Sequence, residues 1–216
     1  MRRGWGAFLS AIAGAAVAYA LFGRSRQLRW GAAEGDPIEA LPGDDLIPDS
    51  DLTATRAISV RAATDEVWPW VAQLGQGRGG LYSYDVLENL VGCDMHSTDG
   101  IVPEWQYVVV GDEVRLHPDV ALEVAAVEPG RSLVLCGGVP MGNVPPPYDF
   151  TWAFVLREQP DGTTRLLVRE RYGYTARWAP LLVEPVAAIS FVMSQKMLRG
   201  IRDRAERAAG LPRTRP

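Results

Sequence analysis

The chain has 216 residues, a formal net charge of −4 at pH 7 and a pI near 5.3. This charge balance disfavours a nucleic-acid partner, because binding to a phosphate backbone needs a basic face. Hydrophobic residues make up 47% and charged residues 22% of the chain, which is ordinary for a globular protein. The length beyond a short apolar N-terminal run is sufficient for one domain with its own core.

The N-terminal run, residues 4–23, carries no charge and is bracketed by arginines, Arg2 and Arg3 before it and Arg24 and Arg26 after it. About 20 residues of α-helix rise about 30 Å, which matches the hydrocarbon thickness of a bilayer. We therefore predict a single transmembrane anchor at residues 1–23, with the membrane as a partner and the cell membrane as the location.

A cleaved signal peptide is the alternative for this run. Residues 18–20, Ala-Tyr-Ala, fit the pattern of a cleavage site. The apolar run continues through Leu21 and Phe22, and it is longer than an h-region of about 7–15 residues, which favours a retained anchor. Arginines on both sides leave the side of the membrane that carries the rest of the chain undetermined.

Residues 24–53 have proline and glycine punctuation and aspartates at positions 44, 45, 49 and 51. This composition is typical of an extended, solvated segment. We predict a tether over residues 24–53, a folded domain over 54–209 and a disordered tail over 210–216.

The predicted domain opens with a strand at 55–62, where apolar and polar residues alternate. Thr64 is placed to cap a helix whose first turn holds Asp65 and Glu66. Ser83 is placed to cap a second, short helix with one apolar face. That face would consist of Val86, Leu87, Leu90 and Val91.

Strand-sized segments separated by turn residues then occupy residues 113–174. The chain closes with a long helix, in which apolar residues recur at steps of three and four. This stripe comprises Val186, Ile189, Met193, Met197 and Ile201. The order predicts an α+β fold, in which a curved antiparallel sheet wraps around the C-terminal helix and a cavity between them holds the functional site.

This arrangement resembles the helix-grip fold of the SRPBCC superfamily, also called START-like or birch-pollen-allergen-like, which includes polyketide cyclases and lipid carriers. The resemblance rests on residues 54–92, on VGDEV at 110–114 and on residues 184–206, and it covers about residues 54–209. It points to membrane-tethered bacterial members. Because the superfamily contains carriers, cyclases and regulators, the resemblance implies the fold and transfers no catalytic residue.

Several inward-facing side chains are candidates for ligand binding. On two strands and the last helix these are Trp152, Phe154, Tyr172, Tyr174, Met193 and Met197. Such residues commonly form a core, but in a partly hollow interior tyrosine hydroxyls also anchor an apolar ligand. Glu170 is two residues from Tyr172, so regular alternation places both on the inward face. Glu170 is therefore either a polar contact in the cavity or a sign that the alternation is interrupted near the end of the strand. Arg169 and Arg171 then fall on the outer, solvated face.

A second group of candidates flanks the short helices. Tyr82, Tyr84 and Trp105 are predicted to gate the entrance to the cavity. Arg78 would either meet an anionic ligand head group or be solvated.

The sequence offers weaker signals for catalysis and for cofactors. His96 with Asp94, or with Glu170, is a candidate acid–base pair, and the alternative for His96 is a hydrogen-bonded loop histidine. We predict no metal site, because the acidic residues and His96 match no metal-ligand spacing. The GxGxxG pattern at 75–80 follows a predicted helix rather than a strand, so we interpret it as a tight turn and predict no cofactor.

Three functional hypotheses follow. The leading one is a membrane-anchored helix-grip domain that binds an apolar or amphipathic, lipid-like small molecule. The second is a cyclase- or aromatase-like enzyme acting on a hydrophobic substrate. The third is a membrane-side interaction module that binds no ligand.

Overall fold

The computed structural model describes residues 23–138 and 145–211, so residues 1–22 of the predicted anchor and most of the predicted tail lie outside the described residues. In the part that is described, six strands form one antiparallel sheet in the order β1-β6-β5-β4-β3-β2. The strands are β1 (Leu52–Val60), β2 (Glu113–His117), β3 (Val120–Glu128), β4 (Ser132–Gly137), β5 (Tyr148–Glu158) and β6 (Thr164–Tyr174). The α-helices are α2 (Arg24–Leu28), α3 (Thr64–Ala72), α4 (Asp85–Leu90) and α5 (Ala179–Ala208), and short 3₁₀ turns lie at Asp44–Leu46 and Pro103–Trp105.

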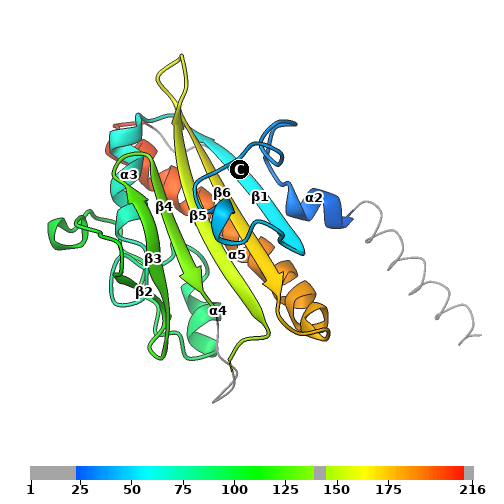
Figure 1. Ribbon diagram of the computed structural model, residues 1–216. Helices are drawn as coiled ribbons and strands as arrows, with labels where there is room; N and C mark the ends of the chain where they lie inside the picture. The colour runs from blue at the N-terminus through cyan, green and yellow to red at the C-terminus, as the bar shows by residue number, and fades with distance from the viewer. Residues whose placement is uncertain (1–22, 139–144, 212–216) are drawn as a thin grey trace, which may run out of the picture.

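The long helix α5 lies along one face of the sheet, and α3 and α4 lie on the same side (Figure 1). Strands β2 to β6 form a meander. The last strand of the meander, β6, also pairs with the first strand of the chain, β1, so that Ala54 lies opposite Glu170. This is the predicted α+β, helix-grip architecture. The strand predicted at 55–62 begins earlier, at Leu52. The first helix begins after Ala63 rather than after a Thr64 cap, and the Glu66 carboxylate accepts a 3.1 Å hydrogen bond from the Ala63 amide.

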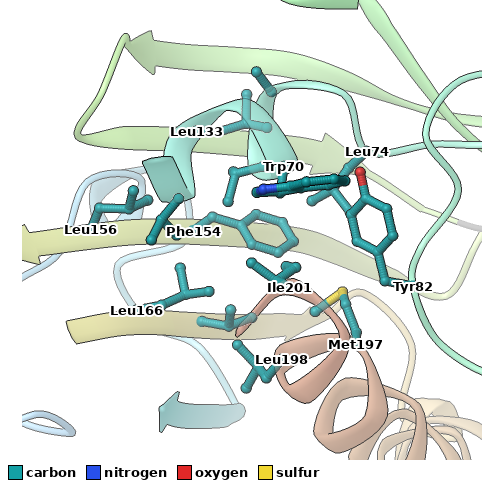
Figure 2. Packing of buried hydrophobic residues seen from close by; sticks show 14 of the residues in the cluster. Trp70, Leu74, Tyr82, Leu133, Phe154, Leu156, Leu166, Met197, Leu198 and Ile201 are labelled. Atoms are coloured by element: carbon teal, nitrogen blue, oxygen red, sulfur yellow. The ribbon is translucent and has the colours of Figure 1, made fainter. Parts of the chain in front are cut away.

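The main hydrophobic core lies between the sheet, α3 and the second half of α5. Large side chains meet there, including Trp70 of α3, Phe154 of β5 and Met197 of α5 (Figure 2). Gly200 permits a close approach of α5 to the loop before α4, because a side chain at this position would collide with the Tyr82 carbonyl oxygen. The buried residues in the first half of α5 are smaller, Ala179, Val183 and Ala187. The helix is therefore tightly packed at one end and lightly packed at the other.

The segment between α2 and β1 covers the opposite face of the sheet, which corrects the predicted solvated tether. Arg169 is buried there: its Nε donates to Thr55 Oγ1 at 2.9 Å, and its Nη1 donates to the Glu39 carbonyl at 2.9 Å and to the Asp44 carboxylate. Arg171 donates to the carbonyl oxygens of Ile47 and Pro48. The prediction of solvated arginines on this face is therefore wrong, because these guanidinium groups bind the acidic segment that composition alone assigned to solvent.

Helix α4 faces the opposite way to the prediction. Val86 is 76% and Leu90 77% exposed, whereas Glu88 is only 6% exposed. Ser83 is not the cap of this helix, since its hydroxyl donates to the Met193 carbonyl oxygen of α5 at 3.1 Å. Periodicity correctly grouped the apolar residues on one face, but that face is turned outward.

We predict that Arg169→Met lowers the free energy of unfolding by about 3–5 kcal/mol. The substitution removes the buried guanidinium from the carbonyl oxygens of Asp36 and Glu39, and it leaves Asp44 with only Arg171 Nη1, at 3.5 Å. Chemical denaturation measures this loss. The matched control is Arg131→Met, which breaks an exposed 3.0 Å pair with Glu128 and should cost no more than about 1 kcal/mol. Equal effects of the two variants would contradict the packed position of the acidic segment.

We also predict that stability falls as the pH rises because of Glu88. Burial and the nearby Asp85 raise the pKa of Glu88 from 4.5 to about 7, and neither carboxylate oxygen has a hydrogen-bond partner among the described residues. The unfolded chain ionises this group near pH 4.5 and the folded chain near pH 7. The penalty therefore builds up between these values and is complete above pH 7, reaching about 3 kcal/mol.

Denaturation of Glu88→Gln across pH 4–9 tests this prediction. The variant should be more stable than the parent above pH 7, and the decline between pH 4.5 and 7 should be reduced. Glu104→Gln, at an exposed position, is the control and should keep the parent profile. An unchanged profile in Glu88→Gln would show that Glu88 is solvated.

Candidate functional site

A cavity of about 180 Å³ lies between the sheet and the first half of α5, where the helix is lightly packed. Its walls come from four strands, α5 and the loop before α4. The lining residues are Leu81, Leu116, Leu122, Tyr148, Phe150, Trp152, Glu170, Tyr172, Val186 and Ser190. The surface that they present to the cavity is almost entirely carbon. A larger hollow of about 380 Å³ elsewhere on the molecule is lined instead by charged side chains such as Glu128, Arg131 and Arg157.

The Glu170 carboxylate on the cavity wall is fully engaged by polar neighbours. Arg56 Nη1 donates to Glu170 Oε1 at 2.6 Å, and the hydroxyls of Ser190 and Ser194 donate to the same oxygen at 2.6 and 3.1 Å. Burial and the adjacent carboxylate raise the pKa of Tyr172 well above its ordinary value, so its hydroxyl stays protonated, 3.5 Å from Glu170 Oε2. The inward parity predicted for Glu170 is correct, and the residue forms a buried ion pair.

Arg56, the partner of Glu170, is the residue that sequence reasoning missed. It is fully buried, its Nε donates to the Gln27 carbonyl of α2 at 3.3 Å, and its guanidinium carbon lies 5.7 Å from the Phe191 ring centroid. The alternation of side chains along β1 could have revealed it, because Arg56 lies on the same inward face as Ile58 and Val60. A cation on that face required a buried anion, and Glu170 was the inward carboxylate already identified.

The predicted aromatic and sulfur-containing residues divide between the cavity and other positions. Trp152 and Tyr172 line the cavity together with Glu170. Phe154 and Met197 belong instead to the packed core at the other end of the helix (Figure 2). Tyr174 packs at the edge of a smaller cluster formed by β1, β6 and the start of α5, and Met193 is half-buried beside Ser83.

The residues predicted to gate the cavity do not line it. Tyr82 is buried in the core, where its hydroxyl accepts a 3.0 Å hydrogen bond from Gln73 Nε2. Tyr84 lies at the surface, with Lys196 Nζ 5.9 Å from its ring centroid. Arg78 donates to the carbonyl oxygens of Trp105 and Ala72 at 2.6 and 3.0 Å. Arg78 therefore ties loops together, which corrects both predictions for it, a solvated group or a contact for a ligand head group.

The candidate acid–base pair lies on an exposed loop outside the cavity. His96 Nε2 and Asp94 Oδ1 are 3.1 Å apart, with the two side chains 81% and 68% exposed. The geometry thus matches the alternative given for His96, a hydrogen-bonded loop histidine. In the glycine-rich segment, reciprocal 3.0 Å backbone hydrogen bonds join Gly75 and Gly80, which confirms the predicted tight turn. Across residues 23–138 and 145–211, no group of three or more His, Cys, Asp or Glu residues is arranged to hold a metal ion.

Comparisons with known proteins return similarity of structure alone. No protein-family model matches the chain, and no curated protein matches it. The aromatase/cyclase Zhui from Streptomyces sp. R1128 aligns at 15% identity over 74% of this chain and 99% of its own, with a TM-score of 0.44. The protein MLL2253 from Mesorhizobium loti aligns at 14% identity over 72% and 98% of the two chains, also with a TM-score of 0.44.

A third solved structure, the di-domain ARO/CYC StfQ from the steffimycin biosynthetic pathway, aligns at 13% identity with a TM-score of 0.45. The alignment covers 77% of this chain and 55% of StfQ. At these identities and TM-scores, the similarities assign no family, ligand or reaction to this chain.

We predict that Arg56→Met lowers the free energy of unfolding by about 3–5 kcal/mol, because Glu170 then remains buried without its cation. The double variant Arg56→Met/Glu170→Met should regain most of this loss, since a buried ion pair replaced by apolar side chains of similar volume is often neutral in stability. Chemical denaturation of the single and double variants measures the difference. A single variant as stable as the parent would contradict the buried ion pair.

Proposed function

We propose that this chain is a membrane-anchored helix-grip domain that binds the apolar end of an amphipathic, lipid-like small molecule between its sheet and α5. The observation that carries the proposal is the carbon-lined cavity of about 180 Å³. Protein interiors seldom leave voids larger than a water molecule, and water needs two to four polar partners to occupy one. The lining supplies few such partners. The Glu170 carboxylate is already bound by Arg56 and two serines, and Trp152 contributes one buried Nε1 donor that has no partner among the described residues. An apolar occupant therefore suits this cavity best.

The cavity volume limits what fits inside. Pockets for whole ligands usually measure about 300–1,000 Å³, whereas a cavity of about 150 Å³ holds a single benzene ring. About 180 Å³ therefore accommodates one ring or a short branched hydrocarbon. Val186, which lines the cavity and is 37% exposed, marks the mouth through which the rest of a longer molecule would extend.

The membrane part of the proposal rests on sequence alone. The uncharged run at residues 4–23 has the length and composition of a membrane-spanning helix and is flanked by arginines. An anchored domain meets ligands dissolved in the bilayer at a high effective concentration without any additional contact. A cavity for an apolar group and a membrane anchor therefore suit the same class of ligand.

We predict that Val186→Phe, which fills the mouth of the cavity, weakens ligand binding at least about tenfold, whereas Val192→Phe on the same helix leaves it unchanged. Val192 is 48% exposed and does not line the cavity, so it is a matched control. The measurement is titration of the purified full chain with geraniol, farnesol and decanoic acid, followed by the intrinsic fluorescence of Trp152 and the other tryptophans.

Native mass spectrometry and solvent extraction of the same preparation show whether a molecule co-purifies. Recovery of an apolar molecule from the parent but not from Val186→Phe supports the proposal. No bound molecule, together with no fluorescence response to any of the three probes, would favour the ligand-free interaction module instead. Equal binding by both variants would place the site elsewhere.

A further inference from the structure

The first half of α5 exposes a stripe of apolar side chains to solvent. Trp178 is 47%, Leu181 81%, Ile189 65% and Val192 48% exposed, and the three within the helix fall on its outward face. The helix has the length and composition of a membrane span, yet only 28% of its most apolar 18-residue window is buried. Exposed apolar surface of this extent usually marks a contact with another apolar phase.

Helix α4 carries a second set of outward apolar side chains. Its outward side chains Val86, Leu87 and Leu90, together with Val91 just after the helix, are 51–77% exposed. The two helices adjoin, because Lys196 of α5 lines the same groove as Val86 and Leu87 and lies over the ring of Tyr84. We call these outward apolar residues the apolar rim. It consists of Leu181, Ile189 and Val192 of α5 with Trp178 just before it, and of Val86, Leu87 and Leu90 of α4 with Val91 just after it.

The apolar rim lies next to the mouth of the cavity. Val186, at the mouth, lies between Leu181 and Ile189 on α5. On the other side, Leu81 of the cavity wall immediately precedes the loop that leads into α4. An apolar phase in contact with the rim would therefore also reach the opening of the site.

The charges around the α5 part of the rim favour an anionic surface. Between residues 178 and 202 the sequence contains one acidic residue, Glu184, and its carboxylate is paired with Arg24 at 2.7 Å. Lys196 and Arg199 on α5 and Arg177 just before it are exposed. An exposed Arg-Trp pair beside a stripe of aliphatic residues is typical of a surface that sits at the membrane–water boundary.

The entry point of the uncharged N-terminal run lies beside the same part of α5. The run ends at Gly23, immediately before α2. The Arg24–Glu184 pair holds α2 to the first half of α5, and the Arg56 side chain binds the Gln27 carbonyl of α2. A run inserted in a bilayer would therefore hold the first half of α5 close to that bilayer.

From these observations we propose that the apolar rim docks on the surface of a phospholipid bilayer, with the mouth of the cavity facing the lipid. This proposal rests on the membrane anchor of the proposed function and adds a defined orientation of the domain. The occupant is the bilayer, rather than a second copy of the chain or residues 4–22, because cations border the α5 part of the rim and the cavity mouth opens beside it. A ligand would pass between bilayer and cavity without crossing water.

The test uses the full chain in vesicles of phosphatidylcholine and phosphatidylglycerol at 3:1, with Cys93→Ser and Cys136→Ser to remove the native thiols. Ile189→Cys carries an environment-sensitive nitrobenzoxadiazole label. Glu158→Cys, at the exposed far end of β5, carries the same label as the matched control. We expect a blue-shifted emission at position 189 that a headgroup-region spin-labelled lipid quenches at least about twofold, and neither effect at position 158.

Flotation of the same vesicles separates this proposal from the one on which it rests. Failure of the full chain to float with lipid would overturn the anchor. If the chain floats but the label at position 189 stays in water, docking is overturned and the anchor is retained. A blue-shifted label at 189 that the spin-labelled lipid does not quench would show a protein occupant, and it would also overturn docking. Circular dichroism of each labelled variant confirms that it is folded.

Discussion

The interior of this protein depends on one buried ion pair, between Arg56 of β1 and Glu170 of β6. Two charges removed from water are costly unless each is closely paired and hydrogen-bonded. Here the pairing involves two strands, the serines of α5 and a carbonyl oxygen of α2, so a single cluster fixes the position of all four elements. On one side of the cluster, large side chains pack the helix against the sheet. On the other side, small residues of α5 leave the cavity.

The serines explain why the two halves of α5 differ. Ser190 and Ser194 must bring their hydroxyls to the Glu170 carboxylate, so the helix surface at this level carries short polar side chains instead of space-filling ones. The residues that precede them towards the cavity, such as Ala187, are also small. Beyond Ser194, Met197, Leu198 and Ile201 resume close packing. The location of the hollow therefore follows from the way in which the ion pair is satisfied.

Both faces of the sheet are covered, and the elements with the fewest buried contacts lie together on the face that α5 covers. The acidic segment before β1 fixes the outer face through Arg165, Arg169 and Arg171. The core fixes α3 and the second half of α5. Helix α4 and the first half of α5 remain, with apolar residues turned outward and the unpaired Glu88 turned inward. Of these two elements, the first half of α5 also contributes Val186 and Ser190 to the cavity wall.

The sequence by itself determined the architecture and part of the site. Period-two alternation predicted the sheet, and the three- and four-residue stripe predicted the long helix. The stripe packs against the sheet only in the second half of α5, at Met197 and Ile201, whereas Ile189 is 65% exposed. Parity correctly placed Trp152, Glu170 and Tyr172 on the inner face. The sequence did not predict which inward residues line the cavity and which are packed in the core. Trp152 and Phe154 share one face of β5, and they differ only in which part of α5 lies opposite them.

Only the tertiary structure decided the partners. Arg56 and Glu170 are 114 positions apart, and Arg169 and Asp44 are 125 apart, so neither pairing leaves a local pattern in the sequence. The same limit applies to α4, whose periodicity defined an apolar face without defining its direction. Local periodicity reports which side chains share a surface because backbone geometry alone sets it. What that surface contacts depends on chain segments that only folding brings together.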